Sequence, residues 1–300
     1  MTGTLYVVGT PIGNLEDLTF RALRVLREVD LIACEDTRRT SRLLAHYEIS
    51  RSLVSLHEHN ERQVAPRLVD QLRAGSSIAL VSDAGTPGIS DPGTLLVRLA
   101  REAGVKVTPV PGPSAITAAL SVSGIPATPF TFLGFPPSSG RARAEWFAEL
   151  RETPGTVVFF EAPHRIERTL KDLQDEAGGS VIRPIVIHRE ISKIHETSVE
   201  WPNKPTSGRD EDVMSKLPER GEFVVVVGPA PPTHPHGLDA SVVVRMYDQI
   251  ETSGALEPDQ IDQALAAIHG VRPARIRRIV KETRIAARRR ARVEPDPSVP

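Results

Sequence analysis

The sequence of 300 residues contains a single cysteine, Cys34. One cysteine excludes a disulfide within the chain and a zinc site built from cysteines. The longest apolar runs, such as LYVV and FVVVV, fall far short of the roughly 18 residues that a membrane-spanning helix needs. The N-terminus also lacks the basic region of a secretory signal. These absences predict a cytoplasmic protein that does not enter a membrane.

Net charge is also nearly absent, at −1, but the charge is unevenly distributed along the chain. Residues 271–300 contain ten Lys/Arg and three Asp/Glu, which gives a local charge of +7 and leaves −8 for the remainder. A basic tail is typical of proteins that bind nucleic acid, but a tail of this kind can also serve only to keep a protein soluble. The charge alone leaves both interpretations open.

Apolar, β-branched runs alternate with helix-like segments in the first part of the chain. Five runs predict strands at residues 4–10, 30–36, 52–57, 77–83 and 105–112. Helical spacing of apolar residues predicts helices between the first and second strands, between the third and fourth, and after the fourth. This alternation is typical of an α/β domain with a largely parallel sheet.

A second group of strands is predicted at residues 130–135, 155–162, 183–190 and 221–228, with helices after the first two. Residues 192–221 are polar, contain three prolines and show no clear periodicity, which predicts mostly irregular loop. Two or three helices are expected after residue 230. The predicted organisation is therefore an N-terminal α/β domain (1–112), a second α/β domain (113–230) and a basic helical extension with a disordered end (231–300).

Three loops rich in glycine and proline follow predicted strands: GTPIGN, SDAGTPGISDPG and PVPGPSA. Glycine lets the backbone approach a ligand closely, and proline stiffens the chain around it. Open α/β sheets bind ligands at the carboxyl ends of their strands. One such loop could be an ordinary tight turn, whereas three favour a binding site. Neither the dinucleotide fingerprint nor the P-loop pattern is present.

Seven segments occur in an order that resembles the tetrapyrrole methylase superfamily: VGTPIGNLEDLT, CEDTR, SDAGTPGISDPG, PGPSA, FLGFPP, FFEAPHR and GEFVVVV. Within the superfamily they resemble the branch that methylates the ribose 2′-hydroxyl of a decoding-centre cytidine in 16S rRNA. The resemblance covers about residues 4–230. It implies two α/β domains with S-adenosylmethionine in the cleft between them, in a homodimer that acts on 16S rRNA assembled into the small ribosomal subunit.

The resemblance also implies which residues contact the cofactor. The positions that match are Pro11, Asp83, Gly85, Ile89, Ser114, Ala115, Phe160 and Pro229, of which the last two match more loosely. The first turn reads GTPIG, whereas the porphyrin-pathway relatives have GxGPG. This difference and the basic tail favour the RNA branch over its alternatives, which are another methyltransferase of the superfamily (with a porphyrinoid or diphthamide-type substrate) and a non-enzymatic RNA-binding protein.

A ribose hydroxyl is a weak nucleophile, so its methylation requires positioning and a group that accepts its proton. The candidate catalytic residues come from CEDTR and FFEAPHR: Glu35, Arg38, Glu161 and His164. Glu35 and Arg38 could instead form an ion pair at the start of a helix, and His164 could lie unreactive in a first helical turn. His57 and His59 lack further ligands in the sequence, so no metal site is predicted.

The C-terminal segment ALAAIHGVRPARIRRIVKE predicts a helix, a glycine turn and a second helix. Four basic residues cluster on and around the second helix: Arg275, Arg277, Arg278 and Lys281. Such a cluster can position RNA through its phosphates, so these four residues are the predicted RNA-binding residues.

Overall fold

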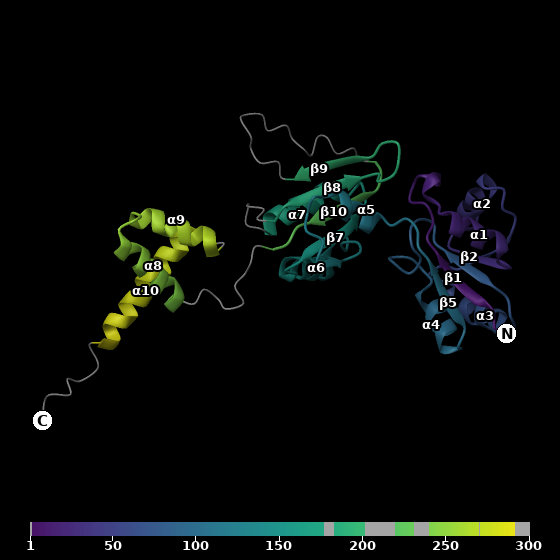
Figure 1. The fold of residues 1–300 in the computed structure, drawn as a ribbon, viewed down its shortest axis with the longest axis horizontal. Helices are drawn as coiled ribbons and strands as arrows, with labels where there is room; N and C mark the ends of the chain where they lie inside the picture. Colours follow the sequence, from purple (N-terminus) through teal and green to yellow (C-terminus); the bar gives the residue numbers. More distant parts are fainter. Residues whose placement is uncertain (1, 177–182, 202–219, 231–239, 270, 292–300) are drawn as a thin grey trace, which may run out of the picture. The chain divides into compact units, whose positions relative to one another are not determined.

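The computed structural model describes residues 2–176, 183–201, 220–230, 240–269 and 271–291. The chain divides into two compact units, residues 1–229 and 230–300. The first unit contains two β-sheets with their helices, and the second unit contains helices (Figure 1). The finer boundary at residue 112 stays a prediction. The predicted disordered end lies largely outside the described residues.

The first sheet is entirely parallel. Its strands, in spatial order, are β3 (Ser52–Ser55), β2 (Leu31–Cys34), β4 (Ile78–Val81), β1 (Thr4–Val8) and β5 (Lys106–Val110). The five strands predicted from the first part of the sequence are thereby confirmed, as is their parallel pairing. In this order the carboxyl ends of β1, β4 and β5 are neighbours, and these are the ends from which the three Gly/Pro-rich loops leave.

Helices cover both faces of this sheet. One face packs against α1 (Phe20–Glu28) and α2 (Thr37–His46), and the other against α3 (Glu61–Arg73) and α4 (Thr94–Glu102). Successive strand residues point to opposite faces, so Ile32 belongs to the first hydrophobic cluster and Ala33 to the second. Burial on both faces explains why the central strands β2 and β4 are continuously apolar rather than alternating.

The N-terminus of α4 is held by a carboxylate from another helix. One oxygen of Glu61, on α3, accepts hydrogen bonds from the backbone N–H groups of Gly93, Leu95 and Leu96 at 3.0–3.2 Å. These are N–H groups that have no partner within a helix, and a negative charge also suits the helix dipole. Glu61 therefore fixes the point at which the second Gly/Pro-rich loop ends.

The second sheet is mixed. Its order is β6 (Phe130–Phe132), β7 (Thr156–Glu161), β10 (Phe223–Val227), β8 (Ile185–Arg189) and β9 (Thr197–Trp201), and only the β6–β7 pair is parallel. Helix α5 (Ala115–Val122) covers one face, while α6 (Gly140–Glu152) and α7 (Ile166–Glu176) cover the other. All five residues of the central strand β10 are buried, as its sequence FVVVV indicates.

One strand of this region was not predicted from the sequence. Residues 197–201 form strand β9, whereas the sequence predicted mostly irregular loop over residues 192–221. Among the described strands, β9 pairs with β8 alone. Trp201 at its end is buried, and its other residues are exposed or half-buried. An edge strand with polar residues carries little hydrophobic signal. Residues 202–219, the rest of that loop prediction, lie outside the described residues.

The second unit packs three helices around a small apolar core: α8 (Ala240–Ser253), α9 (Pro258–His269) and α10 (Pro273–Ala291). The two helices predicted near the C-terminus are confirmed as α9 and α10, whereas the glycine of the predicted turn, Gly270, lies outside the described residues. Buried side chains from all three helices meet, among them Val243, Leu265 and Ile276. Among the described residues, no helix is long and apolar enough to cross a membrane.

Candidate active site

The three Gly/Pro-rich loops contact one another directly. Thr10 of the first loop and Gly85 of the second exchange two backbone hydrogen bonds, at 2.8 and 3.0 Å. Gly9 of the first loop lies so close to Gly112 of the third that a Cβ atom on Gly9 would stand 2.9 Å from the Cα atom of Gly112. The loops therefore form one rigid frame, in which two of the glycines are required by backbone contact.

Gly85 is required for a different reason. Its φ is +78°, in the region that residues with a side chain rarely adopt, although a Cβ atom there would have space. A β-branched residue at this position would strain the bridge to Thr10. A substitution at Gly85 would consequently lower the stability of the fold as well as change the affinity for a ligand.

A cavity of about 380 Å³ opens beside this frame, within the range of small-molecule sites. Residues from both sheets of the first unit line it: Ile12, Ala84, Gly85, Thr86, Ile89, Ser90, Asp91, Ser114, Ala115, Ile116, Phe135, Phe160, Glu161, Ala162, Pro163, Ile191, Glu222, Phe223 and Val224. The wall is mostly apolar, with a few polar groups. Such a surface can enclose a partly apolar organic molecule and orient it through backbone and side-chain polar atoms.

Carboxylates cluster at the ends of β2 and β4. Asp83 accepts a hydrogen bond from the backbone N–H of Asp36 at 3.0 Å and pairs with Arg39 at 3.4 Å. Burial raises the pKa of Glu35, and the nearby charge of Asp83 adds to this effect. Hydrogen bonds from Arg38 lower the pKa of Asp36 to about 2. The cluster thus contains carboxyl groups with very different proton affinities.

Asp91 has the most perturbed carboxyl group of the cavity wall. Burial raises the pKa of Asp91 to about 6, and the charges of Glu35 and Asp83 act in the same direction, although a hydrogen bond with Ser82 opposes them. A carboxyl group that titrates near neutral pH can accept a proton during turnover. The motif search at the sequence level missed Asp91, although it belongs to SDAGTPGISDPG.

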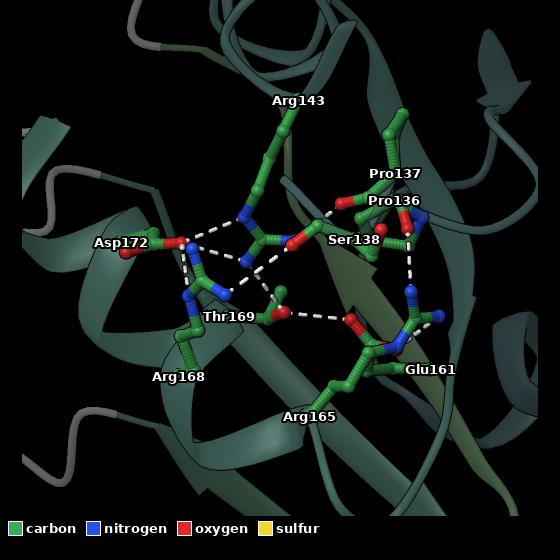
Figure 2. Close-up of polar contacts among 9 residues, drawn as sticks. All are labelled: Pro136, Pro137, Ser138, Arg143, Glu161, Arg165, Arg168, Thr169 and Asp172. Carbon is green, nitrogen blue, oxygen red and sulfur yellow. Dashed lines mark hydrogen bonds and ion pairs between the residues drawn. The ribbon is translucent and has the colours of Figure 1, made fainter. Parts of the chain in front are cut away.

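Glu161, which lines the cavity, belongs to a network of charged side chains (Figure 2). Glu161, whose side chain is fully buried, pairs with Arg165 at 2.8 Å and accepts hydrogen bonds from Thr169 at 2.6 Å and from the backbone N–H of Ala162 at 2.7 Å. Thr169 in turn accepts a hydrogen bond from Arg143, which also pairs with Asp172 at 2.6 Å. Both oxygens of Glu161 are therefore already engaged.

Comparisons with known proteins agree with this architecture. The model of the tetrapyrrole (corrin/porphyrin) methylases matches residues 4–206. The chain belongs to this family. The match includes every part of the cavity wall except the residues of and next to β10. The superfamily resemblance inferred from the motifs is thereby confirmed.

Curated relatives share about half of their residues with this methylase. "Ribosomal RNA small subunit methyltransferase I" of Xylella fastidiosa is 50% identical over 225 residues, which cover 75% of this chain and 81% of the relative. The protein of the same name from Halalkalibacterium halodurans is 44% identical over 233 residues, which cover 75% of both chains. A solved structure, "Crystal structure of diphthine synthase", has a TM-score of 0.57 at 16% identity and covers 75% of this chain and 90% of its own, which shows the shared fold.

The structure places most of this methylase's predicted cofactor residues around the cavity. Five of the eight line it: Gly85, Ile89, Ser114, Ala115 and Phe160. Pro11 and Asp83 lie in lining loops but outside the wall itself. Pro229 lies past the other end of β10, six residues beyond Phe223 and so roughly 20 Å along the chain. Its cofactor assignment does not agree with the position of the cavity.

The four predicted catalytic residues are not brought together. Glu161 lines the cavity, but its carboxylate is engaged by Arg165, Thr169 and Ala162. Arg38 is 85% exposed and pairs with Asp36 rather than with Glu35. His164 is exposed, and neither it nor Glu35 belongs to the cavity wall.

The four predicted RNA-binding residues differ in whether their charges are paired with carboxylates. Arg277 pairs with Asp259 and with the buried carboxylate of Asp262, both at 2.8 Å, so it ties α9 to α10. Arg278 pairs with Glu282 on its own helix. Within the described part of the chain, Arg275 and Lys281 are exposed and have no ion pair. These two remain the residues best suited to contact phosphate.

A metal site is not evident. Within the described ranges, no group of three or more His, Cys, Asp and Glu side chains could hold a metal ion. The rings of His57 and His59 lie 6.0 Å apart as an edge-to-face pair.

Proposed function

We propose that this protein is an S-adenosylmethionine-dependent methyltransferase that acts on 16S rRNA and methylates the ribose 2′-hydroxyl of a decoding-centre cytidine. The observation that carries the proposal is the 50% identity to a relative named as a small-subunit rRNA methyltransferase, across 81% of that relative. The two finer points, the 2′-hydroxyl and the cytidine, rest on the motifs. We further propose that the protein acts in the cytoplasm as a homodimer, on RNA assembled into the small ribosomal subunit.

The cavity fits the proposed cofactor. S-adenosylmethionine supplies a methyl group carried on a sulfonium when it is bound. The wall offers apolar surface at Ile89 and Phe160, and backbone polar groups where Gly85, Ser114 and Ala115 come to its surface. Such a combination suits a ligand with an apolar ring and several polar groups. The rigid frame of the three loops would hold these groups in place before the ligand arrives.

Asp91 is the proposed proton acceptor. Three acidic residues line the cavity: Asp91, Glu161 and Glu222. Glu161 is already engaged by Arg165, Thr169 and the backbone N–H of Ala162. The side chain of Glu222 is 79% exposed and pairs with Lys193 at 3.0 Å. Asp91 has a pKa raised to about 6, close to the value that lets a carboxylate both be ionised at neutral pH and take up a proton.

The proposal is tested with 30S subunits from a strain that lacks this gene. Purified protein and radiolabelled S-adenosylmethionine should transfer label to 16S rRNA at a single nucleotide, which ribose-methylation mapping identifies. Naked 16S rRNA serves as the comparison substrate. Label on a porphyrinoid or on a protein, with none on 16S rRNA, would contradict the proposal in favour of another branch of the superfamily.

Neutralising Arg275 and Lys281 should reduce the salt dependence of RNA binding. The double variant Arg275→Gln/Lys281→Gln is expected to lower the slope of log Kobs against log[salt] by about 1.4–1.8, since each lost phosphate contact removes about 0.7–0.9. Filter binding of rRNA across a salt series measures the slope.

The matched control removes the same charge from exposed positions of the first unit, Arg73→Gln/Arg101→Gln. Its slope should equal that of the unmodified protein. Parallel slopes for all three proteins would show that the basic tail does not bind RNA phosphates. Truncation at residue 271 is a poorer test, because it would remove Ile276 and Val280 from the core of the second unit.

A further inference from the structure

Phe135 is an exposed aromatic ring in the wall of the cavity. It is 51% exposed, although it lies in the short segment between β6 and α6 and lines the cavity. A Cβ atom on the preceding residue, Gly134, would stand 3.9 Å from the Oγ atom of Ser90, which is the neighbour of Asp91. Phe135 therefore belongs to the part of the cavity that adjoins the proposed proton acceptor.

The ring is supported by other aromatic rings. Its centroid lies 5.4 Å from that of Phe160, with 59° between the planes, and Phe160 makes an edge contact with Phe132 at 4.9 Å. These geometries are those that aromatic pairs prefer. One side of Phe135 is thus fixed by packing, while about half of its surface stays open.

Arginine side chains also hold the backbone next to Phe135 (Figure 2). Three consecutive carbonyl groups each accept a hydrogen bond from a different arginine: Pro136 from Arg165 at 3.0 Å, Pro137 from Arg143 at 2.8 Å and Ser138 from Arg168 at 3.3 Å. On the other side of Phe135, the carbonyl of Gly134 accepts from the N–H of Phe160 at 2.8 Å. We name the contacts of Arg143, Arg165 and Arg168 with residues 136–138 the carbonyl clamp.

The carbonyl clamp is itself fixed by the buried charges behind it. Glu161 pairs with Arg165 and Asp172 with Arg143, and Thr169 joins the two pairs. Charged hydrogen bonds of this kind are strong and directional. So many fixed contacts on a segment of a few residues indicate that the position of Phe135 is preorganised for a ligand.

We infer that Phe135 is the platform on which the base of the methylated nucleotide stacks. This inference rests on the proposed function. To bring a ribose hydroxyl into a cavity, the nucleotide must leave its neighbours in the RNA, and its base then needs a new stacking partner. Aromatic side chains serve single-stranded bases in this way. An exposed ring held beside the cavity provides such a surface, and its loss would weaken productive binding of RNA rather than of the cofactor.

The test compares Phe135→Ala, Phe135→Leu and Phe135→Trp in methylation of 30S subunits, with cofactor affinity measured by calorimetry. Phe130→Ala is the matched control, because Phe130 is 44% exposed in β6 of the same sheet and does not line the cavity. We expect Phe135→Ala to lower kcat/KM for 30S roughly 5- to 150-fold, the usual cost of one lost stacking contact. Phe135→Trp should keep an activity close to that of the unmodified protein, whereas Phe135→Leu should lose activity as Phe135→Ala does. In all three variants the Kd of the cofactor should stay within twofold of the unmodified protein's value.

The outcomes separate the two proposals. If the unmodified protein labels 30S and Phe135→Ala or Phe135→Leu labels it equally well, the stacking inference is wrong and the proposed function stands. A parallel loss of cofactor affinity in Phe135→Ala would also overturn it, because Phe135 would then form part of the cofactor wall. If the unmodified protein does not label 30S at all, the proposed function fails, and the inference fails with it.

Discussion

Replacing Arg143 with methionine is expected to lower the free energy of unfolding by about 1.5–3 kcal/mol, the usual contribution of a hydrogen bond to a charged group, because Arg143 is buried while its partner Asp172 is 34% exposed. The guanidinium is 6% exposed and donates to Asp172, Thr169 and the carbonyl of Pro137. Methionine fills similar space but leaves the carbonyl of Pro137 without its donor, and Asp172 keeps only the longer contact with Arg168 at 4.0 Å. Urea unfolding monitored by circular dichroism measures the difference.

The same helix offers a matched control. Arg141 is 92% exposed and pairs with Glu145 one turn away, so Arg141→Met should change stability by no more than about 0.5 kcal/mol. Equal, small losses for both variants would show that the charges around Arg143 are not a stabilising network. A large loss for Arg143→Met that the second change Asp172→Leu partly reverses would assign the cost to the carboxylate of Asp172 that has lost Arg143.

Much of the fold could be predicted from the pattern of apolar residues. The central strands of the first sheet are buried on both faces, so β2 and β4 are continuous apolar runs, and the helices between the strands carry apolar residues at helical spacing. Hydrophobic burial dominates the energy of this region, and burial is what a sequence pattern reports. The apolar pattern of a strand or helix is strongest where the element packs against apolar residues on both of its sides.

The weaker elements show where this reasoning fails. Strand β9 is an edge strand held by pairing with β8, and its neighbour is not visible in its own sequence. The antiparallel position of β10 between β7 and β8 likewise depends on contacts between distant segments. Local periodicity has no information about which strand will be adjacent.

The candidate site was predictable to the extent that backbone shape determines it. The glycine and proline content of the three loops indicated a binding site, and the resemblance to the superfamily singled out Gly85 and Ser114, which line the cavity. The charged residues were not predictable in this way, because the role of a carboxylate depends on its partners. Glu161 looks reactive in FFEAPHR, yet it orients Arg165. Asp91 looks like an ordinary loop residue, yet burial and two neighbouring charges raise its pKa.

Replacing Asp91 with asparagine is expected to lower kcat/KM for methylation by about 10²- to 10⁴-fold, the usual contribution of a general base. In the unmodified protein, kcat/KM should rise with pH up to about 6 and then level off, because Asp91 must lose its proton before it can accept one. The residual activity of Asp91→Asn should lack this rise. Exposed Asp70 on α3 provides the control, and Asp70→Asn should keep the full profile.

Stability gives a second, independent readout of Asp91. Its pKa is 3.8 ordinarily and about 6 in the folded protein, so folding favours the neutral form. The resulting stabilisation is present below pH 4 and is lost as the pH rises through about 6, where the half-buried carboxylate becomes charged beside Glu35 and Asp83. Asp91→Asn removes that charge, so its melting temperature should exceed that of the unmodified protein above pH 6 and approach it near pH 4.

A variant that is less active and more stable at pH 7 would identify Asp91 as a residue kept for catalysis at the expense of stability. Unchanged activity with the same gain in stability would instead show that the proton of the ribose hydroxyl goes to another group.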